Sequence, residues 1–279
     1  MLSYQHEYHA GNHADVLKHS VLALVLAALL RKDKPLRVFD AHAGSGLYDL
    51  GSREARRHAE YRGGIARVLA AADAPPALAP YLDALRACNA GGALRRYPGS
   101  PWLVRSLLRP ADHLVLMELH PQALTALRRL FGQDPQVHLH ERDCFEGLPA
   151  LLPPPERRGL VLIDPSYELK DDYRRVVGLL EACHRRWPTG AYLLWYPLLR
   201  DRPGARLPAR VTALGLRRIY QVTVEVHGEG HEGLRGSGLL AVNLPWGVDA
   251  EIAALAPWLW RSLSPQGRGR WTAGWLVPE

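Results

Sequence analysis

The chain has 279 residues, of which 47% are apolar, and a formal net charge of +7. This length and composition are typical of one large globular domain, with or without an insertion, and a basic surface suits a polyanionic partner, although arginine-rich proteins without one are common. The three cysteines are scattered without a CxxC pair, which argues against a disulfide framework and against a cysteine zinc site. The apolar run Val21 to Leu30 is too short to span a bilayer, so we expect a cytoplasmic protein that contacts no membrane.

The N-terminal stretch, residues 4–19, is rich in histidine and leads into a helix that we predict from His13 to Arg31 because its apolar residues recur at helical spacing. Asn12 is the predicted N-cap, and Asp15 lies in the first turn, where the helix dipole favours an acid. The histidines suggest a metal site, but their spacing contains no HExxH pattern. We therefore expect no metal, and we interpret these side chains as hydrogen-bonding groups around a ligand.

The next segment, Leu36 to Gly46, predicts a buried strand that ends in Asp40, followed by a turn that contains Gly44 and Gly46. Glycines let the backbone approach a ligand closely, and such a turn after an apolar strand is typical of the first ligand loop of a doubly wound sheet. The dinucleotide pattern GxGxxG would place its third glycine at position 49, which is Asp49. The sequence therefore disfavours NAD.

The second strand of the sheet, which ends in Glu118, comes much later than a plain doubly wound fold requires. We interpret the excess, residues 52–97, as an inserted small helical subdomain, broken by Pro75-Pro76 and Gly91-Gly92. Residues 1–51 and 98–279 then form the core. The insertion is rich in arginine, which indicates either contacts with phosphates or a plain solvated helix face.

The rest of the chain alternates between helices and strands, which predicts an α/β fold with a mostly parallel, seven-stranded sheet. The last two strands, separated by a glycine-rich loop, predict a C-terminal antiparallel hairpin. The expected helices in this part are residues 121–131, 171–186 and 249–263, and the expected strands of the whole sheet are residues 36–40, 113–118, 136–141, 160–163, 191–196, 217–227 and 238–245.

Four of the predicted strands are followed by polar groups at their carboxyl ends: Asp40 with the glycine turn, Glu118, Asp143 and Asp164. Ligands of open α/β sheets bind at this edge, so we expect the four groups to converge on one cleft. Asp164 offers a hydrogen-bond acceptor, and Tyr167, two residues after a proline, offers a flat ring. The pair suits a planar molecule with an NH2 group, such as a nucleobase; an ordinary strand end with a packing tyrosine is the alternative.

Taken together, these features resemble a class I S-adenosylmethionine-dependent methyltransferase. Residues 164–167 are similar to the [D/N]PPY motif of enzymes that methylate adenine N6 or, less often, cytosine N4. The run from His9 to His19, with Tyr4 before it and residues 40–44 and 162–165 after it, closely resembles the RlmJ family of bacterial 23S ribosomal RNA adenine-N6 methyltransferases. The similarity extends over essentially the whole chain.

The resemblance implies a class I, Rossmann-like core with an inserted helical subdomain, and 23S ribosomal RNA, protein-free or in an early precursor, as the partner of a monomeric enzyme. It implies a catalytic site of Asp164, the carbonyl of Pro165 and the ring of Tyr167, with Tyr4 and Tyr167 positioning the target adenosine. The residues that it implies for S-adenosylmethionine binding are His19, His42, Gly44, Gly46, Ser100, Glu118, Asp143, Cys144 and Asp164.

One position departs from the motif, because Ser166 stands where a second proline is usual. Proline fixes φ, so we expect a slightly looser turn and a modest effect on rate. Three other functions remain open from the sequence: an NAD-dependent oxidoreductase, a non-catalytic RNA-binding protein and a DNA adenine-N6 methyltransferase. The DNA enzymes usually add a sizeable target-recognition domain, for which the only spare segment is residues 52–97.

Overall fold

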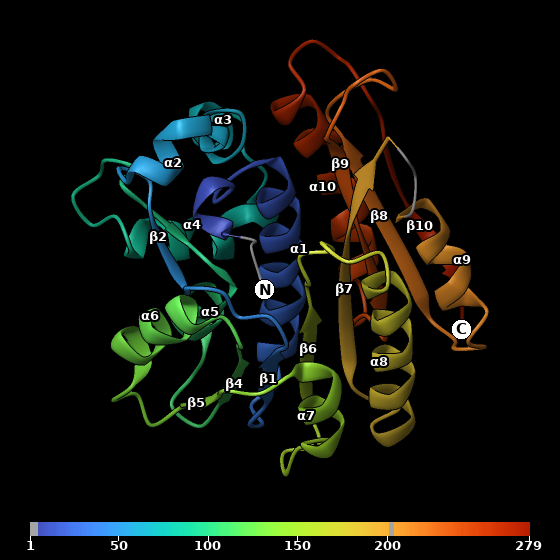
Figure 1. The fold of residues 1–279 in the computed structure, drawn as a ribbon. Helices are drawn as coiled ribbons and strands as arrows, with labels where there is room; N and C mark the ends of the chain where they lie inside the picture. The colour runs from blue at the N-terminus through green and yellow to red at the C-terminus, as the bar shows by residue number, and fades with distance from the viewer. Residues whose placement is uncertain (1–4, 201–203) are drawn as a thin grey trace.

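An eight-stranded sheet forms the centre of the protein, in the order β10-β8-β9-β7-β6-β1-β4-β5 (Figure 1). The computed structural model describes residues 5–200 and 204–279. Strands β1, β4, β5, β6 and β7 run parallel, whereas β9 is antiparallel to β7 and β8, and β10 is antiparallel to β8. The strands are β1 (Arg37–Asp40), β2 (Leu47–Asp49), β3 (Arg96–Pro98), β4 (His113–Met117), β5 (Val137–His140), β6 (Gly159–Ile163), β7 (Ala191–Leu199), β8 (Ile219–Glu225), β9 (Leu234–Val242) and β10 (Trp271–Val277).

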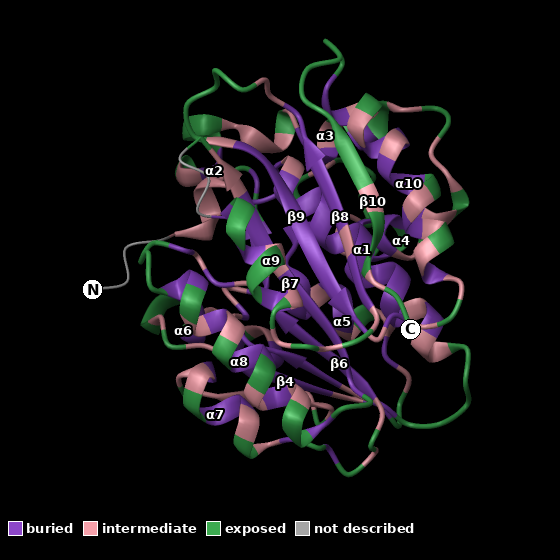
Figure 2. Cartoon of the chain, turned by 90° about the vertical axis from the view of Figure 1, so that its right-hand side faces the viewer, coloured by how far each residue is buried: buried purple, intermediate pink, exposed green. Residues whose placement is uncertain are grey.

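Helices cover both faces of the sheet, and Figure 2 shows the buried strands between them. The α-helices are α1 (His13–Leu30), α2 (Arg53–His58), α3 (Ile65–Ala70), α4 (Ala79–Ala87), α5 (Ser100–Leu107), α6 (Pro121–Phe131), α7 (Cys144–Ala150), α8 (Asp172–Arg186), α9 (Leu207–Thr212) and α10 (Val248–Leu263). Short 3₁₀-helices are η1 (His6–Tyr8), η2 (Glu60–Arg62), η3 (Pro76–Leu78) and η4 (Gly204–Arg206). The predicted α/β fold with its C-terminal antiparallel hairpin is confirmed.

The alternation of side chains along each strand divides the apolar interior into two cores. In β6, Leu160 and Leu162 face the layer that contains α1, α4, α5 and α10. Val161 and Ile163 face the layer that contains α7, α8 and α9. Because the strand is buried on both faces, it appears in the sequence as a continuous apolar run.

The expected count of seven strands is wrong, because β10 adds an eighth along the edge of β8. Most of the residues of β10 are exposed, so hydrogen bonds to β8 define the strand more than burial does. Edge strands of this kind give little periodic signal in a sequence. Helices α5, α7 and α9 and the small β2–β3 ribbon were also not predicted.

Helix α1 lies inside the protein, in contact with α4, α5, α10 and β9. The side chain of Asn12 accepts hydrogen bonds from the backbone N–H groups of Ala14 and Asp15, at 2.9 and 3.0 Å, which confirms the predicted N-cap. By length and composition alone this helix could cross a membrane, but 78% of it is buried within the fold. It is therefore a core helix of a globular protein.

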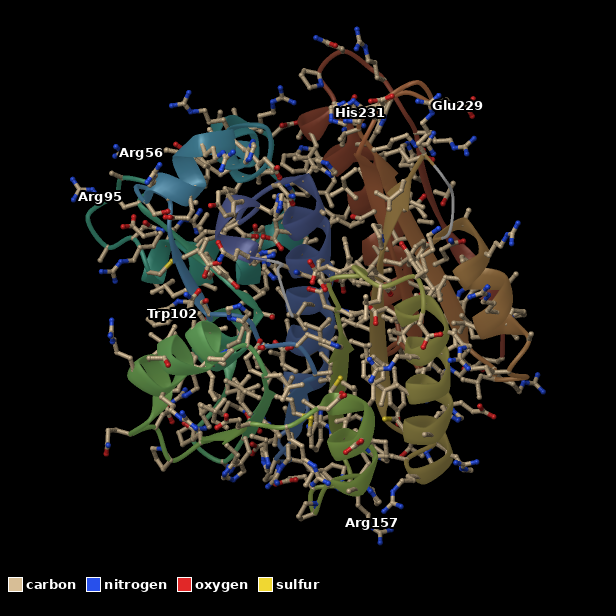
Figure 3. All side chains as sticks on the ribbon, in the orientation of Figure 1. Arg56, Arg95, Trp102, Arg157, Glu229 and His231 are labelled. Carbon is tan, nitrogen blue, oxygen red and sulfur yellow. The ribbon has the colours of Figure 1, made fainter. Side chains whose placement is uncertain are left out.

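The predicted insertion, residues 52–97, begins after β2 and ends at β3, and these two strands pair as an antiparallel ribbon. The segment contains α2, α3 and α4. Ile65 and Val68 of α3 belong to the same apolar core as α1 and α10. Arg56 and Arg95 extend outward from it (Figure 3). The division of the chain into a core and a subdomain stays a prediction.

We predict that Gly159→Ala strongly destabilises the fold. Gly159 opens the central strand β6 at φ +151°, and a Cβ atom there would lie 1.8 Å from the carbonyl oxygen of Arg37 on the neighbouring β1. We expect a loss of more than about 3 kcal/mol in the free energy of unfolding, measured by urea denaturation.

The matched control is Gly178→Ala on the exposed face of α8, where a Cβ atom meets nothing within 4 Å. This change should stabilise the protein by about 0.5–1 kcal/mol, because alanine favours a helix over glycine. Equal stabilities for the two variants would contradict the role of Gly159.

Candidate active site

A cavity of about 540 Å³ lies at the carboxyl edge of the parallel strands. The residues that follow β1, β4 and β6 line it, and the N-terminal stretch that contains η1 lines another wall. The structure brings together most of the predicted site residues, as the sheet topology requires. The predicted residues that line the cavity are His19, His42, Gly44, Ser100, Glu118, Asp143, Cys144, Asp164, Pro165 and Tyr167.

Among the described residues, one predicted site residue, Gly46, is not part of this lining. Gly46 has φ +77°, and a Cβ atom there would meet Leu127 and Leu130 of α6 at 3.0 and 3.1 Å. Gly46 therefore packs against α6 and does not face the cavity. Tyr4 lies outside the described residues.

Glu118 joins the end of β4 to the glycine turn. Its carboxylate accepts hydrogen bonds from the backbone N–H groups of Gly44 at 2.8 Å, Leu119 at 2.8 Å and His120 at 2.7 Å. A carboxylate has about four acceptor positions, so one remains for a ligand. An acceptor fixed in this way at the edge of the sheet suits a sugar hydroxyl.

Asp143 and Phe145 form a second part of the cavity wall at the start of α7. Asp143 caps this helix, accepting from the Phe145 N–H at 2.9 Å, and its other oxygen pairs with Arg175 at 3.1 Å. The guanidinium carbon of Arg175 lies 3.7 Å from the centre of the Phe145 ring. A carboxylate beside an aromatic face matches the donors and the flat surface of a purine.

His42 connects this wall to Asp164. Its Nδ1 accepts from the backbone N–H of Asp164 at 3.3 Å, so its Nε2 carries the proton and points to the Cys144 sulfur, also at 3.3 Å. Burial lowers the pKa of His42 to about 4, with Arg175 adding to the effect and Asp143 opposing it. The ring is therefore neutral at pH 7 and positions its neighbours without adding charge.

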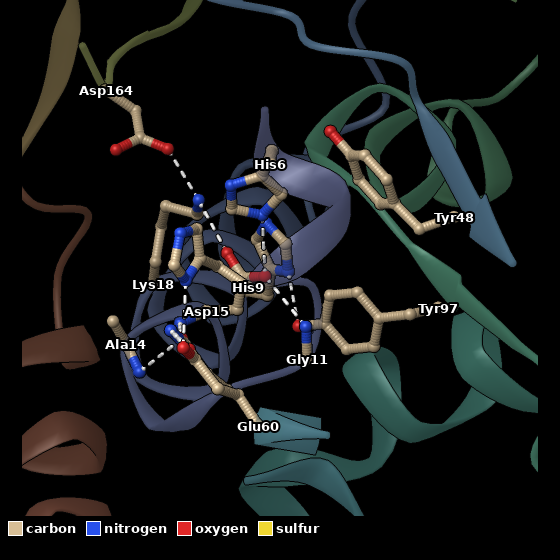
Figure 4. A network of polar contacts seen from close by, with 12 residues as sticks. His6, His9, Gly11, Ala14, Asp15, Lys18, Tyr48, Glu60, Tyr97 and Asp164 are labelled. Carbon is tan, nitrogen blue, oxygen red and sulfur yellow. Dashed lines mark hydrogen bonds and ion pairs between the residues drawn. The ribbon is translucent and has the colours of Figure 1, made fainter. Parts of the chain in front are cut away.

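A buried charge network, which the sequence did not reveal, lies under the proposed catalytic carboxylate (Figure 4). Lys18 of α1 donates to Asp164 at 2.5 Å and to Asp15 at 2.9 Å. Asp15 also accepts from His6 at 2.8 Å and from the Gly11 N–H at 2.9 Å. Burial alone would lower the pKa of Lys18, but the two carboxylates outweigh it and raise that pKa well above its usual value. Lys18 is therefore charged.

A signal for Lys18 does exist in the sequence. Asp15 and Lys18 are three residues apart and are the two charged residues, with histidine counted as neutral, of a mostly apolar helix. Charged residues are almost never fully buried unless they are paired, so a charged pair inside a core helix indicates further partners. The identity of the partner, Asp164, depends on the tertiary fold.

The ring of His19 contacts a tyrosine of residues 52–97. Its Nδ1 lies 2.7 Å from the Tyr97 hydroxyl, which lies 2.9 Å from the Tyr81 hydroxyl. Its Nε2 is buried and has no partner within the described residues. Burial lowers the pKa of His19 to about 3. An unpartnered ring nitrogen on a cavity wall is costly unless a ligand satisfies it.

Tyr167 adopts a left-handed backbone conformation, with φ +53°, which is uncommon for a residue other than glycine. Its hydroxyl donates to the Trp195 carbonyl at 2.7 Å, and its ring centre lies 4.4 Å from that of Tyr173. The residue is 8% exposed. Tyr167 therefore lines the cavity with little exposed surface, while its hydroxyl and ring are held by packing.

Comparisons with known proteins agree along the chain. A sequence model of the family described as "Ribosomal RNA large subunit methyltransferase D, RlmJ" matches residues 33–277. The Escherichia coli protein named ribosomal RNA large subunit methyltransferase J is 44% identical over 280 residues and covers 100% of both chains. The Haemophilus influenzae protein of the same name is 42% identical over 281 residues, with 100% of both covered.

A crystal structure of a Legionella pneumophila protein has a TM-score of 0.89 and 33% sequence identity, and it covers 95% of this chain and 98% of that one. The likeness is therefore one of fold as well as of sequence. It includes the N-terminal stretch and residues 52–97, because the two named relatives are covered from end to end.

We predict that the protein is less stable at pH 5 than at pH 7. Burial lowers the pKa of His13 and His42 to about 4 and that of His19 to about 3, all from 6.5. As the pH falls below 6.5, the unfolded chain binds these protons and the folded protein does not, so stability is lost. Asp40 acts in the opposite sense, because burial raises its pKa to about 6.

For these four groups together, the unfolded state binds an excess of about two protons near pH 5. We expect a loss on the order of 3–5 kcal/mol between pH 7 and pH 5, measured by urea denaturation at both values. A free energy of unfolding that is flat or rises over this range would contradict the buried, neutral state of the three histidines.

Proposed function

The chain belongs to the RlmJ family of ribosomal RNA large subunit methyltransferases, and we propose that its cavity methylates the N6 amine of an adenine in 23S ribosomal RNA. The observation that carries this proposal is the placement of Asp164. Its carboxylate lies at the end of β6, on the wall of a cavity that also contains Glu118 and Asp143. An acceptor for an amine and a set of groups for a nucleoside cofactor therefore share one space.

The residues present fit S-adenosylmethionine. Glu118 has an acceptor position left for the ribose, and Asp143 with Phe145 suits the adenine. The turn at Gly44 and the unpartnered Nε2 of His19 are available to contact the amino-acid part of S-adenosylmethionine. S-adenosylmethionine supplies an electrophilic methyl group when it is bound.

Asp164 and the carbonyl of Pro165 orient the target amine. The lone pair of an adenine amine is delocalised into the ring, so the nitrogen is a poor nucleophile. When both N–H groups donate to Asp164 and to the Pro165 carbonyl, the nitrogen is drawn toward sp3 geometry and its lone pair becomes available. Such positioning supplies much of the rate without a metal.

The buried charge network favours this step electrostatically. Asp15, Lys18 and Asp164 together carry one net negative charge, and they are fixed before the substrate enters. Positive charge develops on the amine nitrogen as its bond to the methyl group forms and the bond between that methyl group and the cofactor's sulfur breaks, and the nitrogen becomes neutral again when it loses one of its two protons. Preorganised charge of opposite sign, in a site with little water, stabilises that transition state.

The target adenine has to leave its stack to reach Asp164, as in other enzymes that act on a base. Tyr167 contacts it with the part of its ring that faces the cavity, and Tyr4 remains a predicted contact. Ser166 allows the turn more freedom than a proline would, with a modest effect on rate. We further propose a cytoplasmic monomer that acts on protein-free or early-precursor RNA, and a core with an inserted helical subdomain.

The proposal is tested by methyl transfer from labelled S-adenosylmethionine to ribosomal RNA from cells that lack the enzyme, followed by mapping of the modified base. Label at N6 of one adenine in 23S ribosomal RNA is the expected result. Incorporation into DNA but not into this RNA would favour the DNA methyltransferase, and no incorporation at all would overturn the proposal.

We predict that Asp164→Asn lowers the rate of methyl transfer at saturating substrates by at least about 100-fold, because the amide removes the negative charge next to the amine. Binding of S-adenosylmethionine, measured by calorimetry, should remain detectable. The matched control is Asp171→Asn, whose carboxylate pairs with Arg174 on the surface. Full activity of Asp164→Asn would exclude Asp164 as the catalytic acceptor.

We predict that Glu118→Gln weakens S-adenosylmethionine binding by about 10–100-fold, since an amide oxygen cannot replace both carboxylate oxygens in the contacts with the glycine turn and the ribose. The readout is the dissociation constant from calorimetry, without RNA. Glu141→Gln, an exposed acid paired with Arg128, serves as the control and should bind normally. Unchanged affinity in Glu118→Gln would contradict the ribose assignment.

A further inference from the structure

Positive charge is concentrated in residues 52–97. This segment contains eight arginines and four acidic residues, a formal charge of +4, whereas the whole chain has +7. More than half of the excess positive charge therefore lies in about a sixth of the chain. A local excess of this size creates a field that attracts a polyanion.

Most of these arginines have no acidic partner. Arg86 pairs with Asp83 at 2.6 Å, and Arg67 donates to the Leu263 carbonyl at 2.7 Å. The other six are exposed, and none forms an ion pair with another residue that the structure describes. We call these six residues the arginine surface: Arg53, Arg56, Arg57, Arg62, Arg95 and Arg96.

Some arginines elsewhere on the chain have an acidic partner, whereas others, such as Arg129 and Arg185, have none among the described residues. Arg105 pairs with Asp134 at 2.6 Å, and Arg128 pairs with Glu141 at 2.7 Å. Clustered like charges without counter-charges repel one another, which costs stability. A bound anion would neutralise the six clustered arginines and remove this repulsion.

The arginine surface adjoins the wall of the cavity. Ala55 of α2 is buried, and α2 packs against η1, whose His6 and Glu7 line the cavity. The guanidinium carbon of Arg57 lies 6.0 Å from the centre of the Tyr8 ring in η1. Glu60, two residues before Arg62 in the short helix η2, lines the cavity as well. Figures 1 and 3 show α2 and Arg56 on the same side of the molecule.

We propose that the arginine surface binds the phosphodiester backbone of the RNA that carries the target adenine, close to the nucleotide that enters the cavity. This inference rests on the proposed function and adds the surface that holds the substrate. Extracting a base from its stack costs free energy, and contacts between arginine and phosphate on the flanking nucleotides offset that cost. Such contacts position an RNA without reading its sequence.

The test is the double variant Arg56→Ala/Arg57→Ala. Binding to protein-free 23S ribosomal RNA is measured by filter binding without cofactor, at a series of salt concentrations. We expect binding to weaken by about tenfold or more at low salt. We also expect the slope of log K against log[salt] to become shallower by about 0.7–0.9 for each lost contact, hence by about 1.5 for the pair.

The matched control is Arg129→Ala/Arg185→Ala. Both arginines are exposed, neither has an ion pair among the described residues, and they lie near the C-terminal ends of α6 and α8. The N-terminal ends of these two helices contribute Gln122 and Asp172 to the cavity lining, so the control residues lie toward the opposite edge of the sheet. The control removes the same charge and should leave binding and slope close to wild type.

Three outcomes decide the proposal. Weaker RNA binding and a shallower slope in the test variant alone support it, provided that its S-adenosylmethionine affinity, melting temperature and rate at saturating RNA stay near wild type. Wild-type binding in the test variant overturns it, and so does an equal loss in the control, which would reflect net charge only. If the wild-type protein binds the RNA but methylates none, the proposed function fails while the arginine surface can still be judged from binding.

Discussion

The ion pair between Lys18 and Asp164 is the interaction on which the rest of the site depends. Burying a charged group costs several kcal/mol unless partners compensate for it, and Lys18 is 5% exposed. Two carboxylates, from its own helix and from the end of β6, supply that compensation. The pair therefore sets where the core helix α1 can lie relative to the sheet, and it orients Asp164 without any ligand.

The same network reaches the N-terminal stretch. Asp15 accepts hydrogen bonds from both His6 and the Gly11 N–H, so the N-terminal segment that lines one wall of the cavity is fixed to the helix whose Lys18 pairs with Asp164. Glu118 does the equivalent for the opposite wall, where it ties the glycine turn to the end of β4. Asp15 and Glu118 thus organise the backbone on two sides of the cavity.

The sequence predicted what local patterns encode. Buried parallel strands appear as apolar runs, and their carboxyl ends meet at one edge, so Glu118, Asp143 and Asp164 could be placed together in advance. It did not predict the position of Gly46, which packs against α6, or the partner of Lys18, because both depend on contacts between distant segments. Strand β10 was missed for a related reason, since its pairing with β8 and not a buried face defines it.

Residues 52–97 contact residues of the cavity wall as well as presenting the arginine surface. Glu60 accepts hydrogen bonds from both His9 and Asn12, and Tyr97 holds the ring of His19. Anions bound at the exposed arginines would therefore lie on the same short elements that fix two sides of the cavity. Because α2 and η2 are anchored to the N-terminal stretch by these contacts, RNA held on the arginine surface would bring its flanking nucleotides to a wall whose position is already set. In this proposal the RNA and the cofactor share one support, and residues 52–97 serve to hold the substrate.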